Sequence, residues 1–448
     1  MKTGFAKVCI DPPYGAPIIG YYQPRFVKGI MDSLYARAAA FDDGEKRAVI
    51  IALDLCLLGQ KYIPAMLDAV AGAAGIDRDA VFITCSHTHT GPVVGKDFAS
   101  ERRSSEAYDE RLMNAVRDAA LYALADLRPT RIETADAQAK GISFIRRYRM
   151  KDGSVATNPG VNNPEIDHAL GTPNETVKLV KLLREGAGDI FLVNFGTHPD
   201  TVGGEYISAD YPGVVCDTLE QALPGVRCIF LQGPQGDVNH INVHPTEAQA
   251  KLHRNGAPEE SRYRVHMGRV IAGAVLSVCS IAEEVSADSI SYASRILTLP
   301  SHQENDRIEE VRPIWELYNA GRRDEIPLKG MAVTTAIAEA KRIIRLEHGP
   351  ESYPFTVSAL RIGDLVFAGY SGEPFTGIRN RIDAGSAFTH TVQCALTNGA
   401  VGYIPTRRAY DEGGYEAKAS VLRPGCDDIV VDGMLGLLQS LKTGTGLK

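Results

Sequence analysis

Short apolar runs alternate with segments of helical periodicity along most of the chain, which predicts an α/β fold with mixed sheets flanked by helices. Buried strands are predicted where apolar runs of about four to eight residues lie between polar turns. These strands are residues 48–55, 80–86, 130–138, 141–147, 177–183, 190–196, 227–231, a pair within 354–369, and 390–396. Helices are predicted at 63–74, 104–127, from 211 onward and at 259–284, and Asp210 is placed to cap the third of them.

Residues 301–350 are rich in charge, have helical periodicity and contain the only tryptophan, Trp315. We expect this segment to be a helical surface insertion, and a role as a lid is a hypothesis without support of its own. The chain has no internal repeat, low-complexity tract or obvious linker. A single catalytic domain spanning 1–448 is therefore the simplest interpretation.

Composition narrows the class of protein. Hydrophobic residues make up 44% and charged residues 23% of the 448 residues, as in globular proteins, and the net charge of −7 argues against nucleic acid or a stable membrane association. No segment resembles a signal peptide or a bilayer span, and the eight cysteines contain no CxxC pair. We therefore expect free thiols and a cytoplasmic location. The oligomeric state is left open.

Two histidines end the predicted strand at 80–86, in the stretch "SHTHTGP" of residues 86–92. Residues at i and i+2 of a strand share a face, so Cys85, His87 and His89 are expected to point the same way. This spacing fits metal ligands or a proton-transfer pair, and it also fits a hydrogen-bonded structural pair. For Cys85 we favour a packed core thiol.

Three further polar clusters follow predicted strands. His198 lies in "NFGTHPD" (194–200), Asp237 and Asn239 in "QGDVNHIN" (235–242), and Glu373 in "SGEP" (371–374). The second cluster is superficially similar to dinuclear metallophosphatases, but the early strand lacks their Asp-x-His. For Asp237 a turn-forming role is a strong alternative, and Glu373 is either a helix-start residue or a metal ligand. The residue chemistry supports only two or three histidines plus a carboxylate, the stoichiometry of a catalytic zinc site.

The motifs jointly resemble the catalytic domain of the neutral/alkaline, non-lysosomal ceramidases. The matching pieces occur in the family's order: 86–92, "GTHP" (196–199), "GDVN" (236–239), "GEPF" (372–375), and "GYIPT" (402–406) followed by Tyr415-Glu416. Residues 29–37 and 52–55 are also similar to the family's N-terminal strands. Five ordered motifs together make a specific signal, although each is weak alone.

This resemblance implies a set of roles that the spacing alone does not give. It implies one zinc ion bound by His87, His198, Glu373 and Tyr403, and hydrolysis of an amide through a metal-activated water. It assigns His89 to proton transfer, and it places Arg146 against the substrate and Tyr415 near the scissile carbonyl. Asn239 is expected to orient water or substrate.

The sequence also departs from the family. Asn239 replaces the serine of its Gly-Asp-Val-Ser-Pro motif, and His240 stands where proline is expected; an amide does not replace the hydroxyl. Neither a secretory signal nor room for the family's C-terminal immunoglobulin-like domain is evident. Three functions stay open: a hydrolase of small soluble or N-acyl amides, a true ceramidase, and a non-catalytic metal-containing binding protein. We favour the first, because aromatic residues are only 7% and 301–350 is charged.

Overall fold

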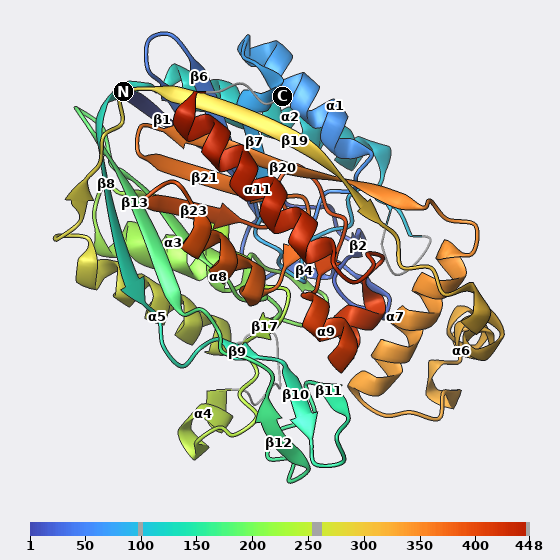
Figure 1. Cartoon of the computed structure of the whole chain (residues 1–448). Helices are drawn as coiled ribbons and strands as arrows, with labels where there is room; N and C mark the ends of the chain where they lie inside the picture. The colour runs from blue at the N-terminus through green and yellow to red at the C-terminus, as the bar shows by residue number, and fades with distance from the viewer. Residues whose placement is uncertain (97–101, 253–261, 445–448) are drawn as a thin grey trace.

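Two β-sheets stacked face to face form the centre of the molecule, and helices cover the outer face of each sheet (Figure 1). This computed structural model describes residues 1–96, 102–252 and 262–444. The layers therefore run helix, sheet, sheet, helix, which confirms the predicted α/β class with mixed, helix-flanked sheets.

The larger sheet has nine strands. Their order is β16 (Arg227–Gln232), β14 (Ile190–Phe195), β13 (Thr176–Arg184), β8 (Arg128–Gln138), β1 (Lys2–Cys9), β5 (Tyr35–Asp42), β6 (Arg47–Leu53) and β7 (Val81–Cys85), with β18 (Glu283–Glu284) also paired to β8. The β14–β16 and β6–β7 pairs are parallel, and the other pairs are antiparallel. The second sheet runs β19 (Ile290–Pro300), β20 (Ser352–Ile362), β21 (Leu365–Tyr370) and β23 (His390–Cys394), with only β21–β23 parallel.

Helices on the outer face of the larger sheet are α1 (Tyr62–Ala74), α2 (Glu106–Ala125), α3 (Asp210–Ala222) and α5 (Arg262–Val278). On the second sheet lie α8 (Thr376–Gly385) and α11 (Cys426–Thr443). The remaining α-helices are α4 (Glu247–Leu252), α6 (Ile308–Asn319), α7 (Met331–Leu346), α9 (Arg407–Glu412) and α10 (Tyr415–Ala419), and short 3₁₀ turns lie at Arg78–Ala80, Asn305–Arg307 and Arg323–Glu325.

Short ladders connect the loops at one end of the sheets. They are β2 (Pro17–Ile18) with β3 (Arg25–Phe26), β4 (Gly29–Ile30) with β15 (Tyr206–Ile207), β9 (Phe144–Ile145) with β17 (Val238–Asn239), β22 (Glu373–Pro374) with β24 (Tyr403–Ile404), and β10 (Arg147–Met150) with β11 (Val155–Thr157) and β12 (Ile166–Ala169). These ladders bring distant motifs together, as described below.

Strand β6 explains why a continuous apolar run forms a strand here. Val49, Ile51 and Leu53 pack under α1 and α2, while Ala48 and Ile50 face the second sheet. Because both faces of the larger sheet are covered, successive residues are buried on opposite sides and no polar alternation appears.

Two expected elements are wrong in extent. The helix expected over 259–284 is described only from Arg262 and ends at Val278, and Glu283–Glu284 instead form β18; residues 259–261 lie outside the described part. The strand expected at 141–147 is two short strands, β9 and β10. The chain leaves the first ladder at Arg146, whose N–H donates to Asp237 O.

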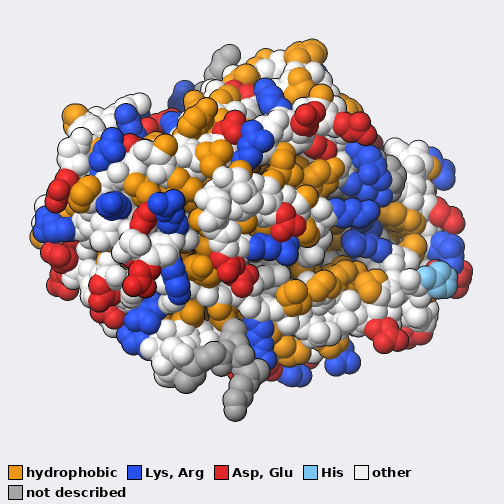
Figure 2. Space-filling view, turned by 90° about the horizontal axis from the view of Figure 1, so that it is seen from above, with side chains coloured by type: hydrophobic (Ala, Val, Ile, Leu, Met, Phe, Trp, Pro, Cys, Tyr) orange, Lys and Arg blue, Asp and Glu red, His pale blue; other side chains and the backbone are white. Residues whose placement is uncertain are grey.

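The surface agrees with the modest net charge. On the face seen in Figure 2, positive and negative side chains are interspersed over most of the view, and one group of Lys and Arg side chains gathers at its right. Among the described helices, none combines the length and the apolar character needed to cross a bilayer.

Candidate metal centre

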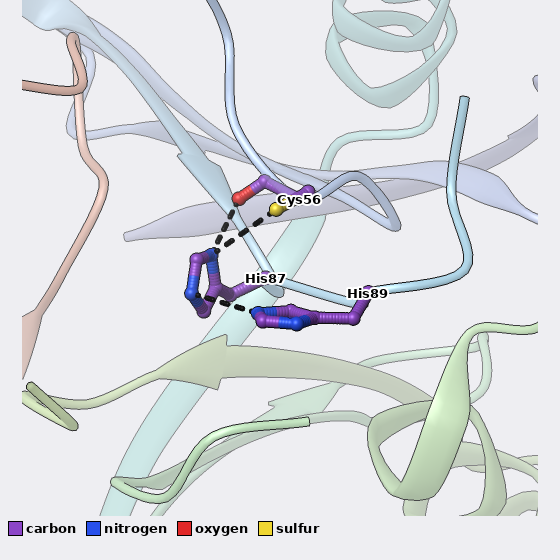
Figure 3. Close-up of side chains that lie close together, drawn as sticks. All are labelled: Cys56, His87 and His89. Carbon is purple, nitrogen blue, oxygen red and sulfur yellow. Dashed lines mark hydrogen bonds between the residues drawn. The ribbon is translucent and has the colours of Figure 1, made fainter. Parts of the chain in front are cut away.

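His87 is held in an unusual conformation just beyond the end of β7. Its φ of 71° lies in the left-handed region that non-glycine residues seldom adopt, and its N–H donates to Leu55 O at 2.8 Å. The ring Nδ1 donates to Cys56 O at 2.8 Å, with Cys56 Sγ at 3.6 Å (Figure 3). Because Nδ1 carries the proton, Nε2 is the free ligand atom.

His198 is oriented in the same manner from a different element. It follows β14, and its Nδ1 reaches Gln235 O at 2.8 Å and Val238 O at 3.0 Å. Its Nε2 is buried and makes no hydrogen bond within the described residues. The proton is again fixed on Nδ1, and the free nitrogen points toward His87.

Glu373 completes a group of three converging donor atoms. Its Oε2 lies 3.2 Å from His87 Nε2 and 3.3 Å from His198 Nε2, but it makes no hydrogen bond among the described residues. The three donor atoms lie within 4.8 Å of one another, and all three residues are buried.

These residues fit a metal ion. Two ligands about 2.1 Å from a tetrahedral zinc ion are about 3.4 Å apart, close to the separations of Glu373 Oε2 from the two nitrogens. Cys56, His87 and His89 form an overlapping candidate group. However, Cys56 faces the protonated Nδ1 of His87, so the group with His198 and Glu373 is the better ligand set.

The pKa shifts in this cluster follow from a carboxylate buried beside two histidines. Burial lowers the pKa of His87, but the nearby Glu373 carboxylate outweighs it and raises that pKa well above its usual value. Burial raises the pKa of Glu373, yet His87 and His198 hold it far below its usual range. A cation bound by these three residues would supply the positive charge that protonated His87 places beside the Glu373 carboxylate in the metal-free cluster.

His89 lies beside the candidate ligands and is not oriented like them. Its Nε2 is 3.3 Å from His87 Nε2, as Figure 3 shows, and its Nδ1 is buried without a hydrogen bond among the described residues. Burial, reinforced by His87, lowers the pKa of His89 well below its usual value. His89 is therefore neutral at pH 7 in the metal-free cluster. Cys85 packs in the core, as expected.

Tyr403 joins the cluster through the β22–β24 ladder, in which it is the direct partner of Glu373. Its ring centroid lies 6.1 Å from that of His198 and 5.7 Å from that of Tyr415. Burial raises the pKa of both tyrosines, so each phenol is protonated in the metal-free cluster.

Arg146 stacks on both of these phenol rings. Its guanidinium carbon is 5.4 Å from the Tyr403 centroid and 6.0 Å from the Tyr415 centroid. Glu416 holds its Nε at 2.5 Å, and its Nη2 donates to Gly236 O at 2.9 Å. Burial lowers the pKa of Arg146, but Tyr403 and Glu416 outweigh burial, so Arg146 stays charged. A fixed cation and two phenols thus form one wall beside the ligand group.

Asn239 is buried in the adjacent ladder, where both ends of its amide have partners. Nδ2 donates to Asn158 Oδ1 at 3.1 Å, and Oδ1 accepts from Ile241 N at 3.1 Å. These bonds hold the loop together.

Asp200 and His240 form a half-buried pair that the sequence pattern did not predict. Asp200 Oδ1 lies 2.9 Å from His240 Nδ1; burial raises the pKa of Asp200, but His240 outweighs it and lowers that pKa. Asp200 follows His198 by two residues, and this spacing is the signal available in the sequence. Pro199 O accepts from His89 N at 3.1 Å, so the segment lies along the site.

Comparisons with known proteins agree on one fold. No model of a protein family matches the chain. Neutral ceramidase A of Dictyostelium discoideum is 24% identical over 252 residues, which cover 51% of this chain and 34% of that protein, so the match spans about a third of that relative's length. The crystal structure of neutral ceramidase from Pseudomonas aeruginosa matches with a TM-score of 0.76 at 17% identity, over 100% of this chain and 75% of that one. A structure described as a ceramidase complexed with C2 gives 0.74 at 16%, over 100% and 76%. The fold expected from the motifs is confirmed.

Proposed function

We propose that this chain, which is neutral ceramidase-like in fold, hydrolyses an amide C–N bond at a site holding one zinc ion. The observation that carries the proposal is the convergence of His87 Nε2, His198 Nε2 and Glu373 Oε2, three buried donor atoms aimed at one point beside a buried arginine. Tyr403 is the fourth ligand in this proposal.

A zinc ion bound there supplies a Lewis acid that polarises a carbonyl and lowers the pKa of water to about 7. The protein's own groups then act on the amide. His89, neutral at pH 7, takes the proton as water attacks the carbonyl carbon, and it gives that proton to the leaving nitrogen as the C–N bond breaks. Arg146, fixed by Glu416, and the Tyr415 phenol donate to the carbonyl oxygen as negative charge develops there.

The surroundings of the cluster support a small or soluble N-acyl substrate. Half-buried polar pairs border it, namely Asn239 with Asn158 and Asp200 with His240. A polar group on the substrate finds partners there, whereas an alkyl chain would desolvate them without replacing their bonds. We further propose that the protein acts in the cytoplasm, on the strength of its free cysteines.

Ceramide-like lipid amides are the second candidate substrate. The support is the likeness to neutral ceramidases and to a ceramidase complexed with C2. A lipid substrate requires an apolar surface continuous with the cluster, so the two candidates are distinguished by chain-length preference.

Metal analysis tests whether zinc is bound, and turnover measurements distinguish the two candidate substrates. We expect one zinc per chain in the purified protein, with faster hydrolysis of short N-acyl amides than of long-chain N-acyl sphingosines. His87→Ala should lose both zinc and activity, while His168→Ala, which removes an exposed histidine on β12, should keep both. The reverse substrate order would favour the ceramidase. Bound zinc with no turnover would favour a binding protein. Unchanged zinc and activity in His87→Ala would overturn the proposal.

A further inference from the structure

The charge-rich insertion at 301–350 packs against the main body through an apolar contact at Tyr22 and through polar side chains. Its helices α6 and α7 lie at one edge of the molecule, near α9 (Figure 1), and pack on each other through Ile308, Val311 and Ile343. Two α7 residues, Glu339 and Arg342, are nevertheless 8% and 3% exposed. Buried charges on a surface insertion call for a specific partner.

That partner is α10. Arg342 donates from Nε to Lys418 O at 2.7 Å and from Nη1 to His302 O at 2.7 Å, and its Nη2 pairs with Glu304. Lys418 Nζ in turn donates to Glu339 Oε2 at 3.1 Å. The C-terminal end of α10 is therefore fixed to α7 through both backbone and side chain.

The segment 415–420 connects α7 to one wall of the site, the arginine wall, which consists of Arg146, Tyr403 and Tyr415. It carries Tyr415 itself, and Glu416 holds Arg146 at 2.5 Å. Ser420 Oγ donates to the backbone carbonyl of Tyr403 at 2.9 Å. The positions of Tyr415, Arg146 and Tyr403 thus depend on where α7 holds α10.

The insertion also contacts the other side of the site, where Tyr21 and Arg25 hold His89. Tyr318 of α6 donates its hydroxyl to Tyr22 O at 3.0 Å, and their ring centroids are 6.1 Å apart. The neighbouring Tyr21 packs edge-on against His89 at 5.4 Å, and Arg25 Nη2 donates to His89 O at 2.7 Å. The residue proposed to move the proton is therefore held by a loop that rests on α6.

We infer that the α6–α7 insertion sets the spacing of the two walls around the bound amide, with Arg342 and Tyr318 as positioning residues. The inference rests on the proposed function for the chemistry that is positioned, while the contacts themselves do not. It differs from a lid, because the insertion is already packed on both walls.

Steady-state kinetics per folded, zinc-loaded enzyme test the effect on catalysis. Arg342→Leu releases α10, and a displacement of about 1 Å at the wall is expected to lower kcat/KM by about 10- to 100-fold, chiefly through kcat. Tyr318→Phe should give a smaller loss, because the ring packing stays. Glu309→Gln, which removes an exposed ion pair with Arg312 on α6, should change neither constant. Zinc content at saturating zinc should stay at one per chain, because three of the four proposed ligands, His87, His198 and Glu373, are not held by the insertion, while displacement of Tyr403 should weaken the affinity.

Hydrogen exchange of the same full-length variants tests the contact between α7 and α10 independently of catalytic activity. Arg342→Leu should speed exchange in 403–420 and leave β13 and β14 unchanged, and Glu309→Gln should alter neither. If Arg342→Leu does not fold, Arg342→Lys keeps the charge, loses the fork geometry and answers the same question. Unchanged exchange in 403–420 and unchanged kcat and KM would overturn the inference. A wild-type protein without amidase activity would instead remove the proposed function, and the exchange result would still decide whether α7 holds this segment.

Discussion

His87 and His198 are prepared for metal binding by the same residue-scale device, a hydrogen bond from Nδ1 to a backbone carbonyl. This bond fixes the tautomer and leaves Nε2 as a ligand. Glu416 acts in a similar way on the arginine wall, where a fully buried carboxylate fixes Arg146. Each reactive side chain is thus held by a partner that does not itself react.

Removing the Glu416 charge should be costly, because it leaves the buried Arg146 cation uncompensated. We expect Glu416→Gln to lower the free energy of unfolding by about 3 kcal/mol. Glu284→Gln breaks an exposed pair with Arg131 and should cost less than about 1 kcal/mol. Urea unfolding of both variants checks this. Equal losses would mean that Glu416 contributes no more than a surface charge.

His302 gives the molecule an acid-sensitive contact beside Arg342. Burial and the Arg342 cation lower the pKa of His302 from 6.5 to about 4. The folded state therefore favours the neutral ring, and this preference stabilises the protein above pH 6.5 and is lost as the pH falls toward 4. Urea unfolding between pH 7.5 and 4 should show a steeper fall in the free energy of unfolding for wild type than for His302→Asn. Parallel falls would contradict the proposed effect of His302 on stability.

Two-residue ladders are the elements that assemble the site. The β22–β24 ladder sets Tyr403 opposite Glu373, and the β9–β17 ladder brings Asn239 to the strand that precedes Arg146. Sequence pattern predicted most of the long strands, such as β6, β7, β13 and β14, and the polar residues that follow them, but it missed β1, β5 and β19. It did not predict these ladders, because two residues have no period, and Tyr403 was therefore named only through family resemblance.

Gly236 permits the close approach of two such segments. A Cβ there would lie 2.6 Å from Glu373 O and 2.8 Å from Phe375 Cδ1. Gly236→Ala should therefore displace Glu373, weaken zinc binding and lower the free energy of unfolding by about 1–3 kcal/mol. Gly203→Ala is the matched control, since its Cβ meets nothing within 4 Å. Zinc titration with chemical unfolding measures both effects. Equal zinc affinity and equal free energy of unfolding in the two variants would show that the close approach at Gly236 does not position Glu373.

The whole molecule depends on the contact between its two sheets, since the strand ends that carry His87, His198 and Glu373 come from both of them. Phe41 of β5 and Phe367 of β21 meet there, with ring centroids 6.4 Å apart. The apolar runs predicted a buried strand at Phe367, but not the strand that contains Phe41. They did not predict which sheets pair, because that depends on contacts between segments hundreds of residues apart.

Truncating this contact should destabilise the fold as a whole. Phe367→Ala is expected to cost about 3–5 kcal/mol. Tyr122→Ala on α2 removes an aromatic ring that is 61% exposed and should change the free energy of unfolding by at most about 0.5 kcal/mol. Denaturant midpoints of the two variants make the comparison. Similar midpoints would contradict the two-sheet core as the main source of stability.

The position of the metal tests the central claim most directly. Crystals of the zinc-loaded protein, measured at the zinc absorption edge, should show one anomalous peak about 2.0–2.2 Å from His87 Nε2, His198 Nε2 and a Glu373 carboxylate oxygen. A peak on Cys56 Sγ and His89, or no peak near His198 and Glu373, would contradict the site on which the proposed hydrolysis depends.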